Sequence, residues 1–496
     1  MITDGRTLEH GTKIQSDVCI VGAGPAGIAM AREFSDCGAF VCVLESGGIS
    51  MDASVQELNR GIDSGTISRQ DHLFDSRNRV FGGTTASWGG WCRPLDAIDF
   101  EARSWVPHSG WPFQKSHVDP FYTRAAEVFD IEPFDPGSVE GLKPPGRFVF
   151  GRDTPVATKI FQISQTYLGK FAKRHSSELE ASENVHVFLH STVTELVTHD
   201  AGDVVSRIEV ACLDGNRYAV EAKYIILAMG GIENARLLLL SNRVQSAGLG
   251  NDYDIVGRYY MEHTWIDGAG SLVFLDARSL YEDYGRWSFP ALSIDADLQR
   301  NAKLLNFRVG LEGRDVTHSA DTKAVGKAIA RLHRPRAYRN PDFPRYYRLD
   351  VSAEQAPNPE SRVTLADTRD ALGNRQARLT WKLSETDWVT IRRSLMIVAR
   401  QMGVERLGRI QITFDESDAW PEQTNGAHHH MGATRMHVDR KQGVVDENCR
   451  VHGIANLFVS GSSVFPTVGF ANPTLTIVAL ALRLADHVKT LLSIRT

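Results

Sequence analysis

The N-terminal part of the chain alternates between apolar runs and a glycine-rich turn, in the pattern of a βαβ unit. Residues 17–21 form a short apolar run that leads directly into a glycine cluster, as expected of a buried parallel strand. A helical pattern of small and apolar residues comes next, and a second apolar run follows at 40–44. The pattern therefore predicts a strand, a helix and a second strand parallel to the first.

Three later stretches predict further parts of the same sheet. Each begins with an apolar run, and the last two end in small residues before an apolar helical pattern. The strands are expected at 186–190 with 192–196, at 224–231 and at 456–461, and the helices at 232–240 and 473–492. The predicted sheet is thus left and then re-entered near the end of the chain.

The middle of the chain carries a different pattern. Between residues 265 and 418, short apolar runs alternate with turn residues, which predicts a mainly antiparallel sheet. A helical pattern over 386–402 is expected to pack on this sheet. The apolar runs are 271–274, 304–309, 363–365 and 377–383.

The glycine cluster has the spacing of a dinucleotide-binding turn. Gly22 permits a tight turn, Gly24 lets the backbone approach a pyrophosphate, and Gly27 lets the helix lie against the strand. The helix N-terminus adds amide donors and the positive end of the helix dipole. Glu45, directly after the second strand, is placed to accept hydrogen bonds from an adenosine ribose. Together these residues predict a dinucleotide site.

The discontinuous sheet indicates which dinucleotide is bound. An NAD domain is usually one contiguous block, whereas a dinucleotide sheet that is re-entered at the C-terminus is the organisation of FAD proteins. We therefore expect FAD as the cofactor.

Composition fits a folded enzyme and excludes several other classes. The 496 residues are 42% apolar and 23% charged, which excludes disordered, collagen-like and coiled-coil chains. The formal charge of −5 gives no overall basic field, so nucleic acid is not an expected partner. The length alone allows about three domains or two large ones.

The cysteines and the polar N-terminal residues indicate the cellular compartment of the protein. The six cysteines form no CxxC pair, and we expect them to be buried free thiols in a reducing compartment. Residues 1–17 are polar, and no apolar stretch reaches the length of a membrane span. We expect a cytoplasmic protein without membrane contact.

Further motifs occur in an order that resembles one enzyme family. They are Gly-Gly-Thr-Thr-Ala-Ser-Trp at 82–88, Ser-Gly-Trp-Pro at 109–112, Val-Gly-Arg-Tyr-Tyr-Met-Glu-His at 256–263, His-His-Met-Gly-Ala-Thr-Arg-Met at 429–436 and the run 465–475. With the N-terminal glycines, they make nearly the whole chain similar to the glucose–methanol–choline (GMC) oxidoreductases, FAD-dependent alcohol oxidases and dehydrogenases. The chain is most similar to the pyranose-oxidase-like, carbohydrate-oxidising branch.

The resemblance implies an α/β fold (α+β overall) with two interleaved domains. A Rossmann-like FAD-binding domain is expected from residues 1–95, 185–264 and 425–496. A substrate-binding domain, built on the mainly antiparallel sheet, is expected from 96–184 and 265–424.

The family pattern also implies site residues. It carries the catalytic base onto His429, because a neutral imidazole can remove a hydroxyl proton near neutral pH, and the group that orients the substrate oxygen onto Asn472. The helix that starts after Asn472 is expected to present its positive end to the flavin. The expected FAD contacts beyond the first turn are Gly82, Gly83, Thr84, Thr85, Val193, Gly461, Pro473 and Thr474.

Two features of these motifs allow a sharper expectation. His428, His429 and His430 could bind a metal or be purely structural, but no cysteine or second histidine cluster lies at ligand spacing nearby, so we expect no metal. In the pyranose-oxidase-like branch, the stretch at 82–88 carries a histidine bonded covalently to the flavin. This chain has Ser87 there, which predicts non-covalent FAD.

Two segments in the middle of the chain allow more than one interpretation. Glu354 and Gln355 could hydrogen-bond sugar hydroxyls, although the adjacent Pro-Asn-Pro turn explains much of the motif without a ligand. An arginine-rich stretch could be a solvated loop, a subunit contact or a lid over the active site. Its arginines are Arg331, Arg334, Arg336, Arg339, Arg345 and Arg348.

The resemblance implies oxidation of a secondary hydroxyl on a sugar or glycoside to a keto-sugar. Electrons would pass to O2 or another acceptor, and the chain could form a homo-oligomer. Two alternatives remain: oxidation of a primary alcohol or an aminocyclitol hydroxyl in a biosynthetic pathway, and a flavin-binding scaffold or lyase without redox chemistry.

Overall fold

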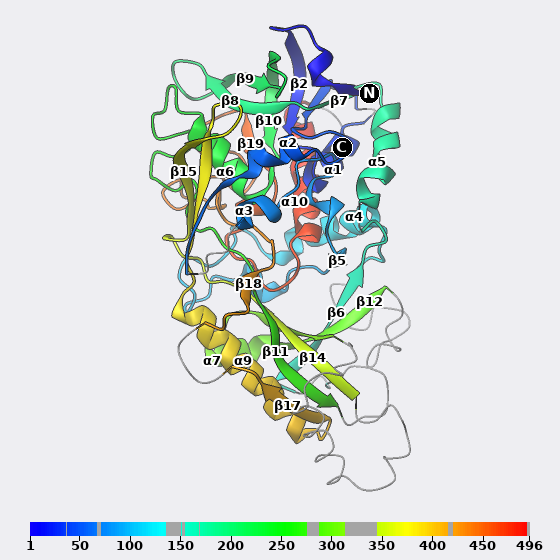
Figure 1. Ribbon diagram of the computed structural model, residues 1–496, viewed down its shortest axis with the longest axis vertical. Coiled ribbons are helices and arrows are strands. Elements are labelled where there is room, and N and C mark those ends of the chain that lie inside the picture. The colour runs from blue at the N-terminus through cyan, green and yellow to red at the C-terminus, as the bar shows by residue number, and fades with distance from the viewer. Residues whose placement is uncertain are drawn as a thin grey trace.

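The computed structural model places two eight-stranded sheets at opposite ends of an elongated molecule (Figure 1). It describes residues 1–35, 37–66, 71–134, 150, 154–167, 169–274, 287–312, 345–414 and 420–493. The predicted α/β fold class is confirmed by this architecture and by the solved structures described below.

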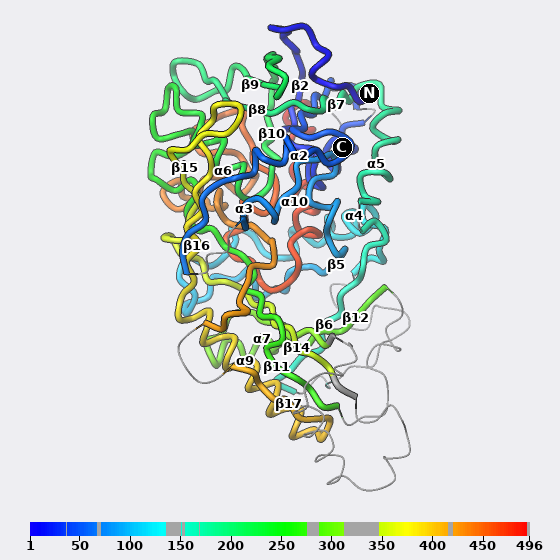
Figure 2. The backbone as a smooth tube through the Cα atoms, in the orientation of Figure 1, coloured from blue at the N-terminus to red at the C-terminus, as the bar shows by residue number. Residues whose placement is uncertain are grey.

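The first sheet is mostly parallel and is assembled from distant parts of the chain. Its strand order is β1-β7-β3-β2-β10-β9-β8, with β19 beside β10, and only β9 and β8 add in antiparallel fashion. Figure 2 shows the blue, green and red segments of the chain together in the upper part of the molecule. The strands are β1 Ile2–Asp4, β2 Lys13–Val21, β3 Val41–Leu44, β7 Val185–Leu189, β8 Thr192–Thr198, β9 Val205–Ala211, β10 Arg217–Leu227 and β19 Leu457–Val459.

Helices pack on this sheet and form its apolar core with it. The last four residues of β2 and all of β3 are buried, as expected when a parallel sheet is covered on both faces. Helix α1 contacts α10 and α5, and α10 also contacts α4. The helices of this part are α1 Pro25–Glu33, α2 Ala53–Gln56, α3 His72–Asp75, α4 Asp119–Phe129, α5 Lys170–Ala181, α6 Gly230–Leu240 and α10 Thr474–Leu491. The predicted strand–helix–strand unit and the predicted C-terminal helix are confirmed.

The second sheet is antiparallel and has two different faces. Its order is β17-β11-β14-β13-β12-β6-β5, with β18 beside β11. One face is apolar and packs on α9 Glu385–Val404, which extends the helix predicted at 386–402. The strands are β5 Trp91–Cys92, β6 Val156–Ile163, β11 Thr264–Phe274, β12 Ser288–Ile294, β13 Phe307–Glu312, β14 Arg345–Ala353, β17 Gly408–Ile412 and β18 Thr424–Gly426; the short helix α7 spans Ala296–Ala302.

Two of the predicted strands do not join this sheet. The runs at 363–365 and 377–383 fall in β15 Arg362–Arg369 and β16 Arg375–Trp381, which form a separate three-stranded sheet with β4 Gly61–Gly65. The reason is burial, because the apolar side chains of β15 and β16 belong to the core around the first sheet and contact α6. The prediction that these runs help to form the antiparallel floor was therefore wrong.

The domain division stays a prediction. Helices α4 and α5 lie within 96–184, the range expected for the substrate domain, yet they pack on α10 and α1.

Four of the six clustered arginines (331, 334, 336 and 339) lie outside the described residues, as does the side chain of Arg345. Arg348, in β14, pairs with Asp350 at 2.7 Å.

All six cysteines are free thiols, and five of them are buried. Within the described ranges, none of the helices combines the length and the apolar composition that crossing a bilayer requires.

Candidate active site

A cavity of about 640 Å³ lies where the glycine turns of the first sheet meet the second sheet. Most of the residues expected at the site line it, although they come from widely separated parts of the chain. The lining includes Gly22, Gly24, Glu45, Gly83, Thr84, Thr85, Val193, His429, Gly461, Asn472, Pro473 and Thr474. Gly27, Gly82, Glu354 and Gln355 are not among the lining residues.

The three N-terminal glycines each meet a different requirement. Gly22 has a φ of +105°, which disfavours any other residue. A Cβ on Gly27 would lie 1.9 Å from the Gly22 carbonyl oxygen, so the helix can approach the strand only without a side chain. A Cβ on Gly24 would meet no protein atom within 4 Å. The space in front of Gly24 is therefore open to a ligand.

The second glycine turn closes on the first. Gly82 and Gly83 have φ values of +94° and +58°, and a Cβ on Gly83 would lie 3.0 Å from the Cα of Gly24. Helix α1 begins beside this contact with no side chain capping it. Uncapped amide groups between two close backbone turns fit an anionic pyrophosphate.

Replacing Gly24 separates cofactor binding from folding. Because the backbone at Gly24 suits alanine (φ −77°) and the added methyl group meets no protein atom, Gly24→Ala should leave the unfolding midpoint of the apoprotein nearly unchanged. FAD should bind at least about 10-fold more weakly, because the methyl group occupies the space in front of the turn. Fluorescence titration with FAD and thermal melts of the apoprotein measure the two effects. Gly27→Ala is the matched control and should lower the melting midpoint itself; equal effects of both variants on FAD would contradict this assignment.

Glu45 lines the cavity beside the first glycine turn. Its carboxylate accepts hydrogen bonds from the backbone N–H groups of Ala23 and Gly47, both at 2.8 Å, which fixes it beside the first glycine turn. Burial raises the pKa of Glu45, and the two backbone N–H groups act against this shift. Val193, in β8, lines the same cavity.

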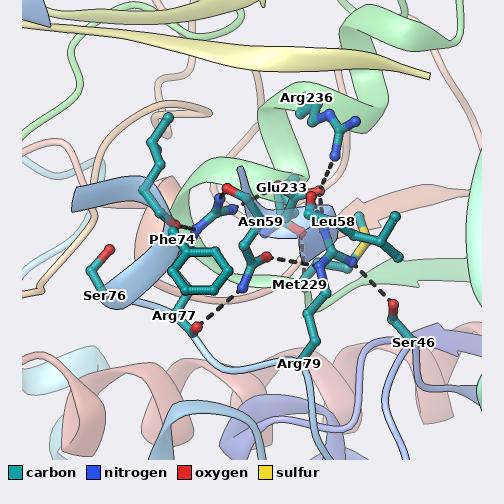
Figure 3. Close-up of polar contacts among 12 residues, drawn as sticks. Ser46, Leu58, Asn59, Phe74, Ser76, Arg77, Arg79, Met229, Glu233 and Arg236 are labelled. Carbon is teal, nitrogen blue, oxygen red and sulfur yellow. Dashed lines mark hydrogen bonds and ion pairs between the residues drawn. The ribbon is translucent and has the colours of Figure 1, made fainter. Parts of the chain in front are cut away.

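Three arginines, of which Arg77 and Arg236 are buried, converge on one carboxylate near Glu45 (Figure 3). Glu233, in α6, pairs with Arg77 at 2.6 Å, Arg79 at 2.8 Å and Arg236 at 3.1 Å. Arg79 also donates to the hydroxyl of Ser46, the neighbour of Glu45, at 3.1 Å. Burial alone would raise the pKa of Glu233, but the three guanidinium groups outweigh it and hold the pKa far below its usual range. This cluster joins the segment before the second glycine turn to α6.

His429 and Asn472 line the same cavity and contact each other. The amide Nδ2 of Asn472 lies 3.2 Å from Nε2 of the His429 ring, although the two residues are 43 positions apart. The other ring nitrogen of His429, Nδ1, lies 2.9 Å from Nδ1 of His263. His429 is thus held between two side chains, with Nε2 on the side of Asn472.

The surroundings keep both imidazoles neutral. Burial, followed by the neighbouring His263, lowers the pKa of His429 well below its ordinary value of 6.5. Burial and the nearby Arg308 guanidinium lower the pKa of His263 to about 4. A neutral His429 has a nitrogen lone pair available at pH 7.

Glu262 holds the backbone of His429 through a buried carboxylate. Its carboxylate accepts hydrogen bonds from the backbone N–H of His429 at 3.2 Å and from the hydroxyl of Tyr260 at 2.9 Å, and it lies 3.0 Å from Nε2 of His72. Burial opposes ionisation of Glu262, but His72 outweighs it and keeps the pKa low. The backbone of His429 is therefore tied to a buried anion.

Glu262 also belongs to a group of metal-ligand atoms in the described part of the chain. Atoms of His72, Glu262 and His430 lie within 4.8 Å of one another, and the three residues are buried. The hydrogen bonds of Glu262 account for its carboxylate without an ion. The absence of a metal stays a prediction.

Helix α10 presents its N-terminus to the same cavity. It starts at Thr474, directly after Asn472 and Pro473, and no side chain caps it. Its 18 residues are largely buried, so its amide groups and dipole act in a site of low dielectric. This arrangement fits a group that carries or gains negative charge.

Glu354 and Gln355 lie behind the site and not in it. Both are fully buried, and Glu354 forms a two-point ion pair with the buried Arg103. Gln355 accepts hydrogen bonds from the backbone N–H of Glu262 and from Nε1 of Trp381, both at 2.9 Å. The structure does not bring these two residues to a position where they can reach a sugar in the cavity.

Ser87 lines the cavity. Its hydroxyl accepts a hydrogen bond from Nδ2 of Asn78 at 2.8 Å. Because a serine cannot form the histidyl bond, denaturation in acid should release all of the flavin into the supernatant. Absorbance of pellet and supernatant after acid precipitation measures this, and a yellow pellet would contradict the prediction.

Several supporting residues were not identified from the sequence as part of the site. His263 and Glu262 fall in the motif at 256–263, so their place beside His429 had a signal there. No sequence pattern pointed to Glu233 or His72, because their partners lie far away in the sequence.

FAD fits the residues present. The cavity is lined by an open glycine turn at an uncapped helix start, by a carboxylate held by two backbone N–H groups and by a second uncapped helix N-terminus. These features match a pyrophosphate, a ribose and an electron-accepting ring in that order.

Comparison with known proteins finds a matching family model and several relatives. The family model described as GMC oxidoreductase matches residues 357–481. The chain is 27% identical to the fructose dehydrogenase large subunit of Gluconobacter japonicus over 66% of this chain and 58% of that protein, which is less than two thirds of its length. It is 23% identical to 2-methyl-1,2-propanediol dehydrogenase of Mycolicibacterium austroafricanum (96% and 95% covered) and 24% identical to paromamine 6'-oxidase of Streptomyces fradiae (95% and 91%).

Solved structures share the fold. Pyridoxine 4-oxidase from Mesorbium loti aligns with a TM-score of 0.59 at 18% identity, covering 95% of this chain and 99% of that chain. Formate oxidase aligns with a TM-score of 0.60 at 16% identity, covering 97% and 99%. The family-model match over residues 357–481 and the relatives aligned along nearly the whole sequence make this chain similar to the GMC oxidoreductases, and it is an FAD-dependent oxidoreductase that acts on CH–OH groups.

Proposed function

We propose that this enzyme oxidises a secondary hydroxyl of a sugar or glycoside to the ketone, with His429 as the base and Asn472 as the group that orients the substrate oxygen. The observation that carries the proposal is the 3.2 Å contact between Nε2 of His429 and Nδ2 of Asn472 at one end of the cavity. The names of two relatives, fructose dehydrogenase large subunit and paromamine 6'-oxidase, support a carbohydrate-like substrate.

The first glycine turn, Glu45 and the start of α10 would hold the cofactor. The second turn, with Gly83, Thr84 and Thr85, would add contacts along it. FAD, when bound, supplies the acceptor for the hydride of the CH–OH carbon. The prediction that FAD is bound without a covalent link is part of this proposal.

His429 accepts the hydroxyl proton at Nε2. Because both imidazoles are neutral, one of the two facing Nδ1 atoms must carry a proton. If His429 carries it and donates to His263, Nε2 of His429 keeps a lone pair, which faces Nδ2 of Asn472 in this structure and can accept a hydroxyl proton when substrate is bound. His263 therefore acts as a positioning residue that selects the basic tautomer.

Asn472 holds the substrate oxygen. An N–H of its Nδ2 can donate to a hydroxyl oxygen that at the same time gives its proton to His429. Two contacts on one oxygen fix the direction of the adjacent C–H bond. The α10 N-terminus, next to Asn472, stabilises negative charge at this end of the cavity.

A second candidate is oxidation of a primary alcohol or an aminocyclitol hydroxyl. It is favoured by the names of two relatives, paromamine 6'-oxidase and 6'''-hydroxyparomomycin C oxidase. The same two residues would act on such a hydroxyl, so the difference lies in the walls of the cavity. The final electron acceptor, O2 or another compound, and a homo-oligomeric state stay predictions, as does the cytoplasmic location.

Anaerobic mixing of the holoenzyme with candidate alcohols tests the proposal. Pyranoses and their glycosides should cause loss of the FAD absorbance, with a keto-sugar as the product identified by mass spectrometry and NMR. Primary alcohols and aminocyclitols form the comparison set. Faster loss of absorbance with that set would favour the second candidate, and turnover without any loss of absorbance would contradict redox chemistry altogether.

A further inference from the structure

The second sheet presents a polar and aromatic wall beside the reacting end of the cavity. Strands β11 and β18 pair in antiparallel register, with Trp265 directly opposite Asn425. Opposed residues of an antiparallel pair point to the same face, so both side chains belong to one wall. Asp267, two residues further along β11, accepts a hydrogen bond from Nε1 of Trp265 at 2.9 Å.

This wall stands next to the catalytic pair. Trp265, Asp267 and Asn425 all line the cavity that His429 and Asn472 line. Only Gly426, Ala427 and His428 separate Asn425 from His429 along the chain. A substrate that places a hydroxyl at His429 therefore reaches this wall with its remaining atoms.

The indole ring of Trp265 is held in place from the protein side. The Arg308 guanidinium lies 5.2 Å from the centre of this ring and 5.1 Å from that of Trp91, which also lines the cavity. Arg308 is buried, and its neighbours across the sheet are Ser293 and Ser352, whose small side chains leave room for it. A ring fixed in this way loses little conformational entropy when a ligand stacks on it.

The chemistry of the wall selects a class of ligand. A partly exposed indole receives an apolar ring face, whereas a carboxylate and an amide at its edge receive hydroxyl groups. The Asp267 side chain is about half exposed (49%), and a simple aliphatic alcohol offers no second hydroxyl to its carboxylate or to the Asn425 amide. A pyranose ring offers both surfaces, with C–H groups on its faces and hydroxyls around its rim.

We propose that Trp265, Asp267 and Asn425 form a subsite for the pyranose ring of the substrate, in which the ring stacks on the indole and its hydroxyls donate to Asp267. This assignment rests on the proposed function, because it concerns the same substrate. It names residues of β11 and β18, in place of Glu354 and Gln355, as the groups that distinguish a sugar from other alcohols.

Binding to a non-reacting holoenzyme tests the subsite without relying on turnover. The His429→Ala holoenzyme is titrated calorimetrically with D-glucose, D-galactose, D-mannose and their methyl glycosides. Adding Trp265→Ala or Asp267→Ala should raise the Kd of the sugars that bind by at least about 10-fold, while FAD content and the melting midpoint stay unchanged. Asp297→Ala is the control, because the side chain of Asp297 is 88% exposed.

Steady-state kinetics with His429 intact give a second readout. Asp267→Ala should raise KM for the pyranoses about 10-fold with little change in kcat, and should leave KM for cyclohexanol unchanged, since cyclohexanol has no further hydroxyls. Trp265→Ala should raise KM for both, and Trp265→Phe should restore part of the loss.

The outcomes separate the subsite from the proposed function. Sugars that bind the His429→Ala holoenzyme equally well with and without the added changes would overturn the subsite and leave the proposed function standing. If none of these sugars binds, and none causes loss of FAD absorbance in the unmodified enzyme, both are overturned.

Discussion

The His429→Ala variant should keep its FAD and lose about 1,000-fold in the rate at which substrate abolishes the FAD absorbance, within the range that general bases supply. The imidazole is the group that can take the hydroxyl proton at the reacting end of the cavity, with Nε2 at 3.2 Å from the orienting amide of Asn472. His429 is not among the expected cofactor contacts, so flavin content should not change. Anaerobic stopped-flow mixing with the fastest sugar of the panel measures the rate.

The neighbouring histidine provides the control for this experiment. His428 lies one residue away and is exposed to the cavity, whereas the ring held between His263 and Asn472 is that of His429. His428→Ala should therefore lose far less activity than His429→Ala. The assignment of the base would be wrong if the two losses were equal or reversed.

The pH dependence of the unmodified enzyme follows from the same group. His429 acts as a base only when neutral, and its pKa is lowered well below 6.5, mainly by burial. The rate of absorbance loss should therefore be constant near pH 7 and decline only as the pH falls through the lowered pKa. Its acid limb should lie below pH 6.5.

The Glu233→Ala variant should lose about 3–5 kcal/mol of unfolding free energy, the usual result of removing one partner from a buried ion pair. Arg77 and Arg79 would lose their common carboxylate, while Arg236 would keep Asp370 at 2.6 Å. The segment before the second glycine turn would then no longer be tied to α6, so FAD affinity should also fall. Urea denaturation and FAD titration measure the two losses.

An exposed pair gives the matched control for Glu233. Glu57 pairs with Arg60, and about half of each side chain is exposed (51% and 44%). Glu57→Ala should leave the unfolding free energy nearly unchanged, because water screens the pair. A Glu233→Ala effect as small as that of Glu57→Ala would show that the buried cluster does not stabilise the protein.

The sequence was most informative where local backbone geometry sets the residue. Gly22 and Gly27 could be recognised because a left-handed turn and a close helix–strand approach each exclude side chains. The order of the motifs also predicted that distant segments would form one sheet and one cavity. His429 and Asn472 could be paired only through the resemblance to a family, since no local pattern relates residues 43 positions apart.

The sequence was least informative where tertiary partners decide. Glu354 was a candidate sugar ligand, but its carboxylate pairs with Arg103, which lies 251 positions away. The apolar runs in β15 and β16 fit any antiparallel sheet equally well, and the pairing of β16 with β4 depends on contacts across the whole chain. The convergence of three arginines on Glu233 likewise has no signature in the spacing of these residues.

The most direct test is a single-turnover experiment on the unmodified holoenzyme. It is mixed anaerobically with a pyranose of the panel, either unlabelled or carrying deuterium at the carbon that becomes the ketone. We expect the FAD absorbance to disappear, more slowly by several-fold with the deuterated sugar, and one keto-sugar to form for each flavin. Full retention of the FAD absorbance with every sugar and alcohol of the panel, or product formation without its loss, would contradict the assignment of this protein as a sugar-oxidising flavoenzyme.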